Sequence, residues 1–376
     1  MRPVTDQQKV SRAKLAYIID ATAAPVCIIA PISSWAAAVN SYVPADAGIS
    51  GFQLFLRTIP YNLYAILTLV MVFFICFTGF DFGLMKKHEE NAAKGDLFTS
   101  GGDEFEQVSE DEVNPGGKVM DLVLPVAVLI VSAIGAMIYT GYLGGAKDII
   151  TAFSGYCDAE TSLIFATMVT IFFMMLLYLP RKVVDFKGFM ESLVEGFKLM
   201  IPAITILIFA WSLKGIGDAM GLAEFVGGIV GENASASIFI PVVLFAVAIF
   251  LSFSTGTSWG TFAILVPIAT GMFAGNTSLE MMIISVSAVL AGAVCGDHVS
   301  PISDTTVMSS AGAQSNHLNH VSTQMQYAAI VAGVCMVGYI IAALTKIWWL
   351  TLGISLLILL AILMGMKIVL SKRQAA

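Results

Sequence analysis

Long apolar runs and short polar segments alternate along the whole chain. The apolar runs lie near residues 15–39, 60–80, 120–141, 160–179, 199–213, 237–253, 260–274, 279–313, 326–345 and 347–370. A helix needs roughly 20 residues to cross a bilayer, so 199–213 and 260–274 are short for a full crossing. None of the runs alternates with the period of two that is typical of a membrane β-barrel. The pattern predicts an all-α polytopic membrane protein with about ten transmembrane or re-entrant segments.

The composition agrees with this class of protein. The chain is 57% hydrophobic and 12% charged, and its mean hydropathy is +0.86. One soluble core could not bury that much apolar surface, so the lipid bilayer is the expected partner. The five cysteines are widely spaced and predict neither a disulfide framework nor a metal site. No basic patch indicates nucleic acid, no cofactor is expected, and a homo-oligomer stays open.

Positive charges in the short segments predict the orientation of the spans. Lys and Arg gather in the N-terminal segment, in the loop after residue 179 and at the C-terminus. Ten crossings place all three on one side, which the positive-inside rule assigns to the cytoplasm. The segment 81–119 falls on the same side, and its stretch DEFEQVSEDE, residues 103–112, predicts a solvated acidic loop.

The sequence CGDHVSPISDTTVMSS, residues 295–310, follows an apolar run with no loop between. A charge at membrane depth costs on the order of 3 kcal/mol or more, so Asp297 and Asp304 need a cation, a proton or a partner. Pro301 has no N–H and should leave the carbonyl of Asp297 without its helical partner. Carboxylates, a freed carbonyl and hydroxyls suit a hard cation such as Na⁺. The hydroxyls nearest in sequence are those of Ser303, Thr305 and Thr306. The alternative is a short polar loop outside the membrane.

A second polar feature is LSFSTGTSWGTF, residues 251–262. Hydroxyl side chains alternate there with Gly256 and Gly260 between two apolar halves, which predicts a re-entrant hairpin or a broken helix. Thr255 and Thr257 would supply neutral oxygens to an ion. The alternative is a plain tight turn between two spans.

A third feature is LAYIIDATAAPVCIIAPISSW, residues 15–35, in which Asp20 lies inside an apolar span that Pro25 and Pro31 interrupt. A structural pair between Asp20 and a Lys or Arg of another helix is the alternative to a role in ion binding. The Pro-Ile-Ser of this span recurs after Ser300 in a similar context. Paired proline-broken spans of opposite orientation are typical of transporters that are built from inverted repeats.

Three blocks of the chain resemble the NhaC-type Na⁺/H⁺ antiporter family. They are GDHVSPISDTTVMSSAGAQSNHLNHVSTQMQYA at 296–328, FSTGTSWGTFAILVPIA at 253–269, and SRAKLAYIIDATAAPVCIIAPISSW at 11–35. The resemblance implies an inverted-repeat ion-transporter fold with sodium or proton coupling. It also implies relatives that exchange malate and lactate, so the substrate stays open.

The resemblance and the polar features together predict the organisation of the chain. We expect one membrane transporter domain, 1–376. Its parts are a partial first repeat at 1–80, the acidic loop at 81–119, connecting helices at 120–198, a second repeat core at 199–325 and C-terminal spans at 326–376. Nothing before residue 11 can match the hydroxyl-rich hairpin, whereas family members carry further spans there. We therefore expect a longer reading frame, or a second chain that supplies the missing half.

The predicted function is exchange of Na⁺ for H⁺ across the cytoplasmic membrane. Na⁺ and H⁺ would compete for one oxygen cluster, with Asp304 as the first ligand and Asp297 as the second. Burial favours the protonated carboxyl, and a bound Na⁺ favours the charged one. His298 is a candidate proton relay, and packing within a polar loop is its alternative role. Pro301, Pro31 and Gly256 would break the helices.

Other classes of protein fit the sequence less well. An organic-acid or amino-acid carrier on the same fold is the second hypothesis, although no arginine lies in the predicted spans. The chain is not expected to be an enzyme. An intramembrane aspartyl protease would need its two carboxylates on facing helices, and a zinc enzyme would need a metal motif that is absent, since His317 and His320 are expected in a polar loop.

Overall fold

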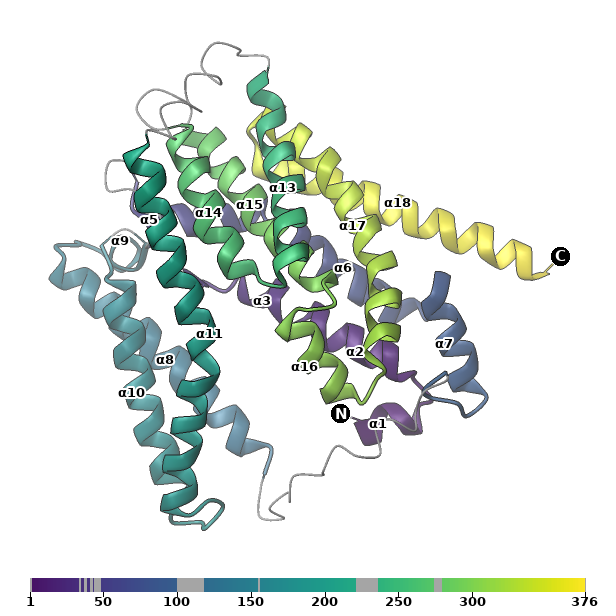
Figure 1. Cartoon of the computed structure of the whole chain (residues 1–376), viewed down its shortest axis with the longest axis horizontal. Coiled ribbons are helices and arrows are strands. Elements are labelled where there is room, and N and C mark those ends of the chain that lie inside the picture. The colour runs from purple at the N-terminus through teal and green to yellow at the C-terminus, as the bar shows by residue number, and fades with distance from the viewer. Residues whose placement is uncertain are drawn as a thin grey trace. The chain divides into compact units, whose positions relative to one another are not determined.

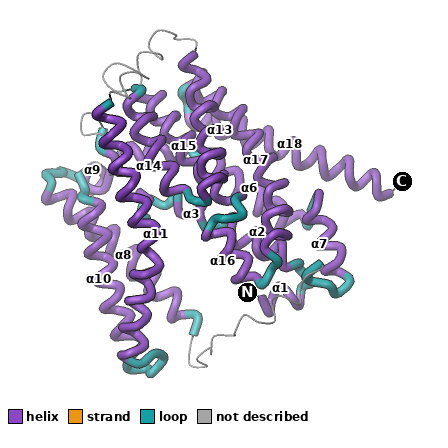
Figure 2. Tube along the Cα trace, viewed as in Figure 1, coloured by secondary structure: helices purple, strands orange, loops and turns teal. Residues whose placement is uncertain are grey.

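The structure is a computed structural model that describes residues 2–33, 35–36, 39–40, 43, 49–99, 118–154, 156–220, 236–273 and 279–375. Within these ranges the chain forms helices joined by turns and contains no strand (Figure 2), so the predicted all-α polytopic fold is confirmed. Six of the described helices are long and apolar enough to cross a membrane. They are Leu63–Ala93, Met120–Leu143, Ala159–Tyr178, Leu279–Val299, His317–Thr345 and Trp348–Leu370.

The chain divides into two compact units, shown with their helices labelled in Figure 1. Unit 1 comprises residues 1–29, 57–107 and 212–376, and unit 2 comprises residues 30–56 and 108–211. The helices of unit 1 are α1 (Arg2–Gln7), α2 (Arg12–Ala21), α3 (Ala24–Cys27), η1 (Ile59–Tyr61), α6 (Leu63–Thr78), α7 (Gly83–Ala93), η3 (Ala236–Phe239), α13 (Ile240–Thr255), α14 (Ser258–Gly271), α15 (Leu279–Val299), α16 (Asp304–Ala313), α17 (His317–Thr345) and α18 (Trp348–Ala375). Unit 2 holds α8 (Met120–Leu143), α9 (Ile149–Ser154) and α10 (Ala159–Tyr178), together with most of α5 (Gly51–Thr58) and α11 (Phe186–Ala219).

Unit 2 is built on α8 and α10, which pack against each other. A Cβ at Gly141 of α8 would lie 2.1 Å from the carbonyl oxygen of Ala152, so only glycine permits α9 to approach this closely. Asp121 at the start of α8 pairs with Arg181, and its carbonyl accepts a hydrogen bond of 2.6 Å from Tyr178 Oη. These contacts hold the end of α10 against the start of α8, and α9 against the end of α8.

The central helix of unit 1 is α15, in which every side chain from Met281 to Val299 is buried. Helices α6, α13, α14 and α17 pack around it, and Figure 1 shows α13, α14 and α15 side by side. A Cβ at Gly292 would lie 2.4 Å from the carbonyl oxygen of Phe245, and one at Gly296 would lie 2.3 Å from that of Ile249. Small residues four apart let two backbones touch, and such packing drives helix association in lipid. The glycines therefore fix α15 directly against α13.

Two interrupted helices pair with each other in unit 1. A turn at residues 22–23 separates α2 from α3, and a turn at residues 300–303 separates α15 from α16. Helix α2 packs against α16, while α3 packs against α15, so the first half of each contacts the second half of the other. Asp20 and Asp297 each lie just before a break and interact electrostatically. The fold thus gathers the ends of both broken helices, and the carboxylates on them, in one region.

Two segments differ from the sequence prediction. Helix α17 begins at His317 rather than near residue 326, and His320 is fully buried instead of lying in a polar loop. Within the segment 81–119, which was expected to be solvated, residues 83–93 form α7, which packs against α2 and α17 and buries His88. The hydropathy pattern placed these polar residues in solvated loops, but their partners lie inside the unit rather than in water. The acidic stretch 103–112 lies outside the described residues.

Candidate functional site

The break that follows α15 is a tight turn, and the carbonyl of Asp297 accepts a hydrogen bond within it. Pro301 cannot donate to the carbonyl of Asp297, but the N–H of Ser300 donates to it at 3.1 Å. The carbonyl thus loses its helical partner, as expected, but gains this one hydrogen bond, and its use as an ion ligand stays a prediction. The chain resumes with Ser303 in an extended conformation before α16 begins at Asp304.

The turn between α13 and α14 packs directly on this break. Gly256 has a φ of +67°, and a Cβ there would lie 2.8 Å from the carbonyl oxygen of Ile302. Ser300 Oγ donates to the carbonyl of Phe253 at 2.7 Å. The two polar motifs, about 45 residues apart in sequence, therefore meet in space. Glycine is required at this tip both for the left-handed turn and for the close approach.

Asp297 lies at this meeting point with 3% of its surface exposed. Ser258 Oγ, on the first residue of α14, donates to Asp297 Oδ2 at 2.9 Å and also lies 3.2 Å from the carbonyl oxygen of Ala293. The Ser303 side chain interacts with the same carboxylate by a hydrogen bond. Asp297 Oδ1 has no partner with full hydrogen-bond geometry among the described residues. The neighbours of this carboxylate are thus hydroxyl oxygens and the positive N-terminal end of a helix.

The other residues predicted around the break are placed in two groups. Thr306 is buried, and its hydroxyl has no partner within the described part of the chain. Ser303 is buried and lies 2.9 Å from Thr305, hydroxyl to hydroxyl. Asp304, by contrast, is exposed, and its Oδ1 accepts the N–H of Thr305 at 2.9 Å. The structure therefore brings Ser303 and Thr306 to the buried side of the break and leaves Asp304 on its outer side.

The hairpin residues named from the sequence lie at the tip but do not contact Asp297. Thr255 is exposed, and its hydroxyl donates to the carbonyl of Leu251 at 2.8 Å. Thr257 caps α14 by accepting the N–H of Trp259 at 3.2 Å. Pro31 lies in a half-buried bend within unit 2. The hydroxyl that reaches the carboxylate is instead that of Ser258.

Asp20 is completely buried in a cluster that draws on α2, α15 and α17. Its Oδ2 accepts from Gln324 Nε2 at 2.9 Å and lies 3.3 Å from His320 Nε2. Gln324 Nε2 also donates to the carbonyl of His298. The alternative proposed for Asp20, a pair with Lys or Arg, is not what the described residues show. Its partners are an imidazole and an amide.

His298 is also fully buried, and its ring is held on two sides. Its Nδ1 lies 2.7 Å from Tyr64 Oη. The Tyr17 ring stacks on the imidazole with centroids 6.1 Å apart, and it stacks on Tyr327 at 5.0 Å. His298 Nε2 has no partner among the described residues. A fixed ring with one unsatisfied nitrogen fits either predicted role, packing or proton relay.

Sequence reasoning missed three residues that the structure places in these clusters. Ser258 was one of several hydroxyls at the hairpin, and no pattern singled it out. His320 and Gln324 lie four apart on what proves to be the buried face of α17. A polar i, i+4 pair next to Tyr327, within an extended helix, was the available signal. It was hidden because the apolar run appeared to begin only at residue 326.

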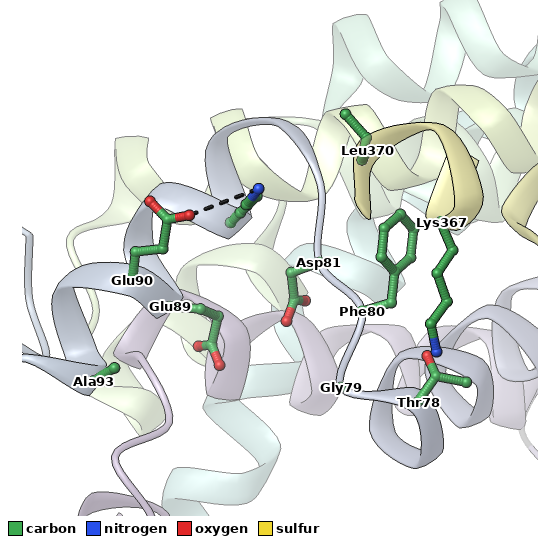
Figure 3. A pocket seen from close by; sticks show the side chains of 10 residues that line it. Thr78, Gly79, Phe80, Asp81, Glu89, Glu90, Ala93, Lys367 and Leu370 are labelled. Carbon is green, nitrogen blue, oxygen red and sulfur yellow. Dashed lines mark ion pairs between the residues drawn. The ribbon is translucent and has the colours of Figure 1, made fainter. Parts of the chain in front are cut away.

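A third polar network lies at the N-terminal end of α2, opposite Asp20. Lys14 Nζ lies 2.7 Å from Asp81 Oδ2 and 3.3 Å from Glu89 Oε2, and these side chains are largely buried. Tyr327 Oη donates to Asp81 Oδ1 at 3.0 Å. Asp81 and Glu89 also line a cavity of about 400 Å³ between α7 and α18, where Figure 3 shows them near one another, with Lys367 on the far side. Asp81 thus lines this cavity and also contacts Tyr327, the outer ring of the stack that continues through Tyr17 to His298.

Buried carboxylates at the ends of broken helices, in an apolar bundle, are typical of ion-coupled secondary transporters. The comparison with known families agrees. Residues 15–344 match the Na⁺/H⁺ antiporter family, and the chain belongs to that family.

Two curated proteins are similar in sequence. An uncharacterized protein of Haemophilus influenzae is 40% identical over 362 residues, which cover 92% of this chain and 66% of that protein. The malate-2H(+)/Na(+)-lactate antiporter of Bacillus subtilis is 32% identical over 192 residues, which cover 50% of this chain and 39% of that protein. The chain thus spans less than two thirds of the length of each. No solved structure matches it.

Proposed function

We propose that this chain carries out Na⁺/H⁺ exchange across the cytoplasmic membrane, with Asp297 as the group for which the two ions compete. The observation that carries the proposal is the buried Asp297 carboxylate, 2.9 Å from the hydroxyl of Ser258 at the tip of the α13–α14 hairpin. Membership of the Na⁺/H⁺ antiporter family supports it.

The chemistry of the site suits alternate occupation by Na⁺ and H⁺. Na⁺ prefers oxygen ligands, and here a carboxylate, Ser258, Ser303 and Thr306 offer oxygen atoms from three helix ends. An empty, charged Asp297 inside an apolar bundle is costly, so the carboxylate is stable only with a proton or a cation. Exchange follows if the site crosses the membrane only when it is filled.

Asp304 stays a separate prediction. It lies seven residues after Asp297, exposed at the first turn of α16, and interacts electrostatically with Asp297. A carboxylate in this position would attract cations to the break and hold them less tightly than a buried one. We keep it as a candidate ligand at the outer side of the break.

Localisation in the cytoplasmic membrane, with both termini in the cytoplasm, belongs to the same proposal. It is supported by the Lys and Arg in the N-terminal segment, in the loop after residue 179 and at the C-terminus. The six apolar helices support a multi-pass protein.

Exchange of organic acids is a second candidate function. The similarity to the Bacillus subtilis malate-2H(+)/Na(+)-lactate antiporter favours it. The N-terminus of α14, which carries Thr257 and Ser258 at the hairpin tip, presents N–H groups that could bind a carboxylate.

One experiment tests both candidates. In everted membrane vesicles with an acidified lumen, a pH-sensitive dye reports proton exit when NaCl, LiCl, KCl, malate or lactate is added. We expect NaCl alone to release protons in vesicles with the wild-type chain and not in vesicles with Asp297→Asn at equal membrane insertion. Release that needs malate or lactate would favour the second function, and no Na⁺-dependent release at all would refute the first.

A further inference from the structure

The cluster around Asp20 contains buried polar atoms that no side chain satisfies. Within the described residues, Asp20 Oδ1, Gln324 Oε1, His298 Nε2 and His320 Nδ1 have no hydrogen-bond partner. All four side chains are at most 1% exposed. Buried polar atoms are normally paired, and unpaired ones concentrate where a ligand binds. Four of them from α2, α15 and α17 mark a place where a water molecule, an ion or a proton can bind.

The atoms that surround the two buried carboxylates differ in kind. Asp297 faces hydroxyl oxygens, which are ligands for Na⁺. Asp20 faces nitrogen atoms instead: Gln324 Nε2 donates to its Oδ2, and His320 Nε2 lies beside the same oxygen. Amide hydrogens repel a cation, whereas an imidazole beside a carboxylate can share a proton with it. The structure therefore separates a cation environment from a proton environment.

We propose that Asp20 and His320 together form a proton-binding site that is distinct from the Na⁺ site at Asp297. Without a bound proton the pair carries one negative charge inside the bundle. With one proton, shared between the Asp20 carboxylate and the imidazole, the pair is neutral. The proton comes from the water on one side of the membrane and returns to the water on the other. Gln324 cannot titrate, and it positions Asp20 through the hydrogen bond to Oδ2. The inference rests on the proposed exchange and adds a second proton-carrying group to it.

The surroundings of the pair contain few other charges. Helices α2, α6 and α17 contribute only phenols there, and Asp304 of α16 is exposed. Asp81, just before α7, and Glu89 of α7 are held by Lys14 at the opposite end of α2. The titratable groups that face the pair are Tyr17, Tyr64, Tyr327, His298 and Asp297. Protonation of the pair therefore leaves Asp297 as the carboxylate of this group that still needs a proton or a cation.

The test counts protons exchanged per Na⁺. In proteoliposomes whose membrane potential is held at zero with a K⁺ ionophore and equal K⁺ on both sides, the Na⁺ gradient that just balances a fixed pH gradient gives this ratio. We expect Asp20→Asn and His320→Gln each to lower the ratio by one proton. The matched control is His317→Gln on the same helix, whose ring lies 2.6 Å from the carbonyl oxygen of Pro301 and 3.1 Å from Ser310. It should leave the ratio unchanged. An unchanged ratio in Asp20→Asn would overturn the proposal.

A second measurement does not depend on transport and covers variants that fail to exchange ions. Purified protein in detergent without Na⁺ is moved from about pH 9 to about pH 6, and a dye counts the protons taken up. Wild type should take up one proton more than Asp20→Asn, because the variant lacks the carboxylate that shares this proton. Equal uptake would refute the site. Wild type that lacks Na⁺-coupled proton movement but shows this difference would instead count against the proposed function alone.

Discussion

Replacing Gly296 with alanine is the sharpest test of how the fold positions the ion site. The new Cβ would lie 2.3 Å from the carbonyl oxygen of Ile249, whereas an ordinary contact begins at 3.4 Å. The obstacle is backbone, so α15 and α13 must separate by about 1 Å at this level, the difference between those two distances. Asp297 is the next residue and moves with the helix.

The displacement should weaken Na⁺ binding and the fold by amounts that can be measured. Because α14 follows α13 directly and packs against it, a shift of this size lengthens the 2.9 Å hydrogen bond between Ser258 and Asp297 to about 3.9 Å, beyond the range of such a bond. Hydrogen bonds to charged groups contribute about 1.5–3 kcal/mol, so the apparent Na⁺ affinity should fall by about ten- to a hundredfold. Overpacking should also lower the free energy of unfolding by about 1–3 kcal/mol.

The assay is a NaCl titration of proton release in everted vesicles, paired with a thermal unfolding scan of the purified protein. Gly333→Ala is the matched control, because it adds the same methyl group to α17 at a position with nothing within 4 Å. It should match wild type in both measurements. If Gly296→Ala kept its Na⁺ affinity within about twofold of that control, the close contact with α13 would not position the site.

Four further predictions follow from the sites. Asp297→Asn should abolish Na⁺-dependent proton release, and Asp304→Asn should abolish it only if that exposed carboxylate is also a ligand; dye measurements at equal membrane insertion separate the two. The apparent Na⁺ affinity of wild type should weaken from about pH 9 to about pH 6, since protons occupy the same carboxylate, and an affinity independent of pH would contradict a shared site. Lys14→Met should destabilise the protein by about 3–5 kcal/mol, because it leaves the buried Asp81 and the partly buried Glu89 without their cation, whereas Lys86→Met, in a more exposed pair, should cost at most about 1 kcal/mol. Deleting residues 100–112 should leave insertion and exchange intact, and loss of insertion would show that this segment is packed.

The sequence predicted those parts of the fold that depend on long apolar runs and on helix breakers. The interruption of α15 before α16 follows from Pro301, and the hairpin tip follows from Gly256, because both residues restrict the local backbone wherever they occur. The approximate positions of the apolar spans follow in the same way. The compensation of the Asp297 carbonyl by Ser300 could not be predicted, since it depends on the geometry of one turn.

The candidate site was only partly accessible from the sequence. Asp20 and Asp297 stand out because a carboxylate in an apolar run is costly wherever it lies. Their partners do not stand out, since His320 and Gln324 are about 300 residues from Asp20 in the chain. A long-range partner becomes visible only once α17 is known to start at His317 and to pack on α2. Asp304, the first choice by sequence, is exposed because the direction of a side chain at a helix start depends on the preceding turn.

The short, rigid helix α2 connects two distant parts of unit 1. Ten residues give a rod of about 15 Å, too short to bend appreciably. Lys14 near one end pairs with Asp81, just before α7, and with Glu89 of α7, and Asp20 near the other end is held by α17. Displacement of Asp20 must therefore either break the Lys14 contacts or carry α7 along with it. Because breaking them costs several kcal/mol, α2 and α7 should move together. The volume of the cavity beside Glu89 should then change when Asp20, near the other end of α2, is displaced.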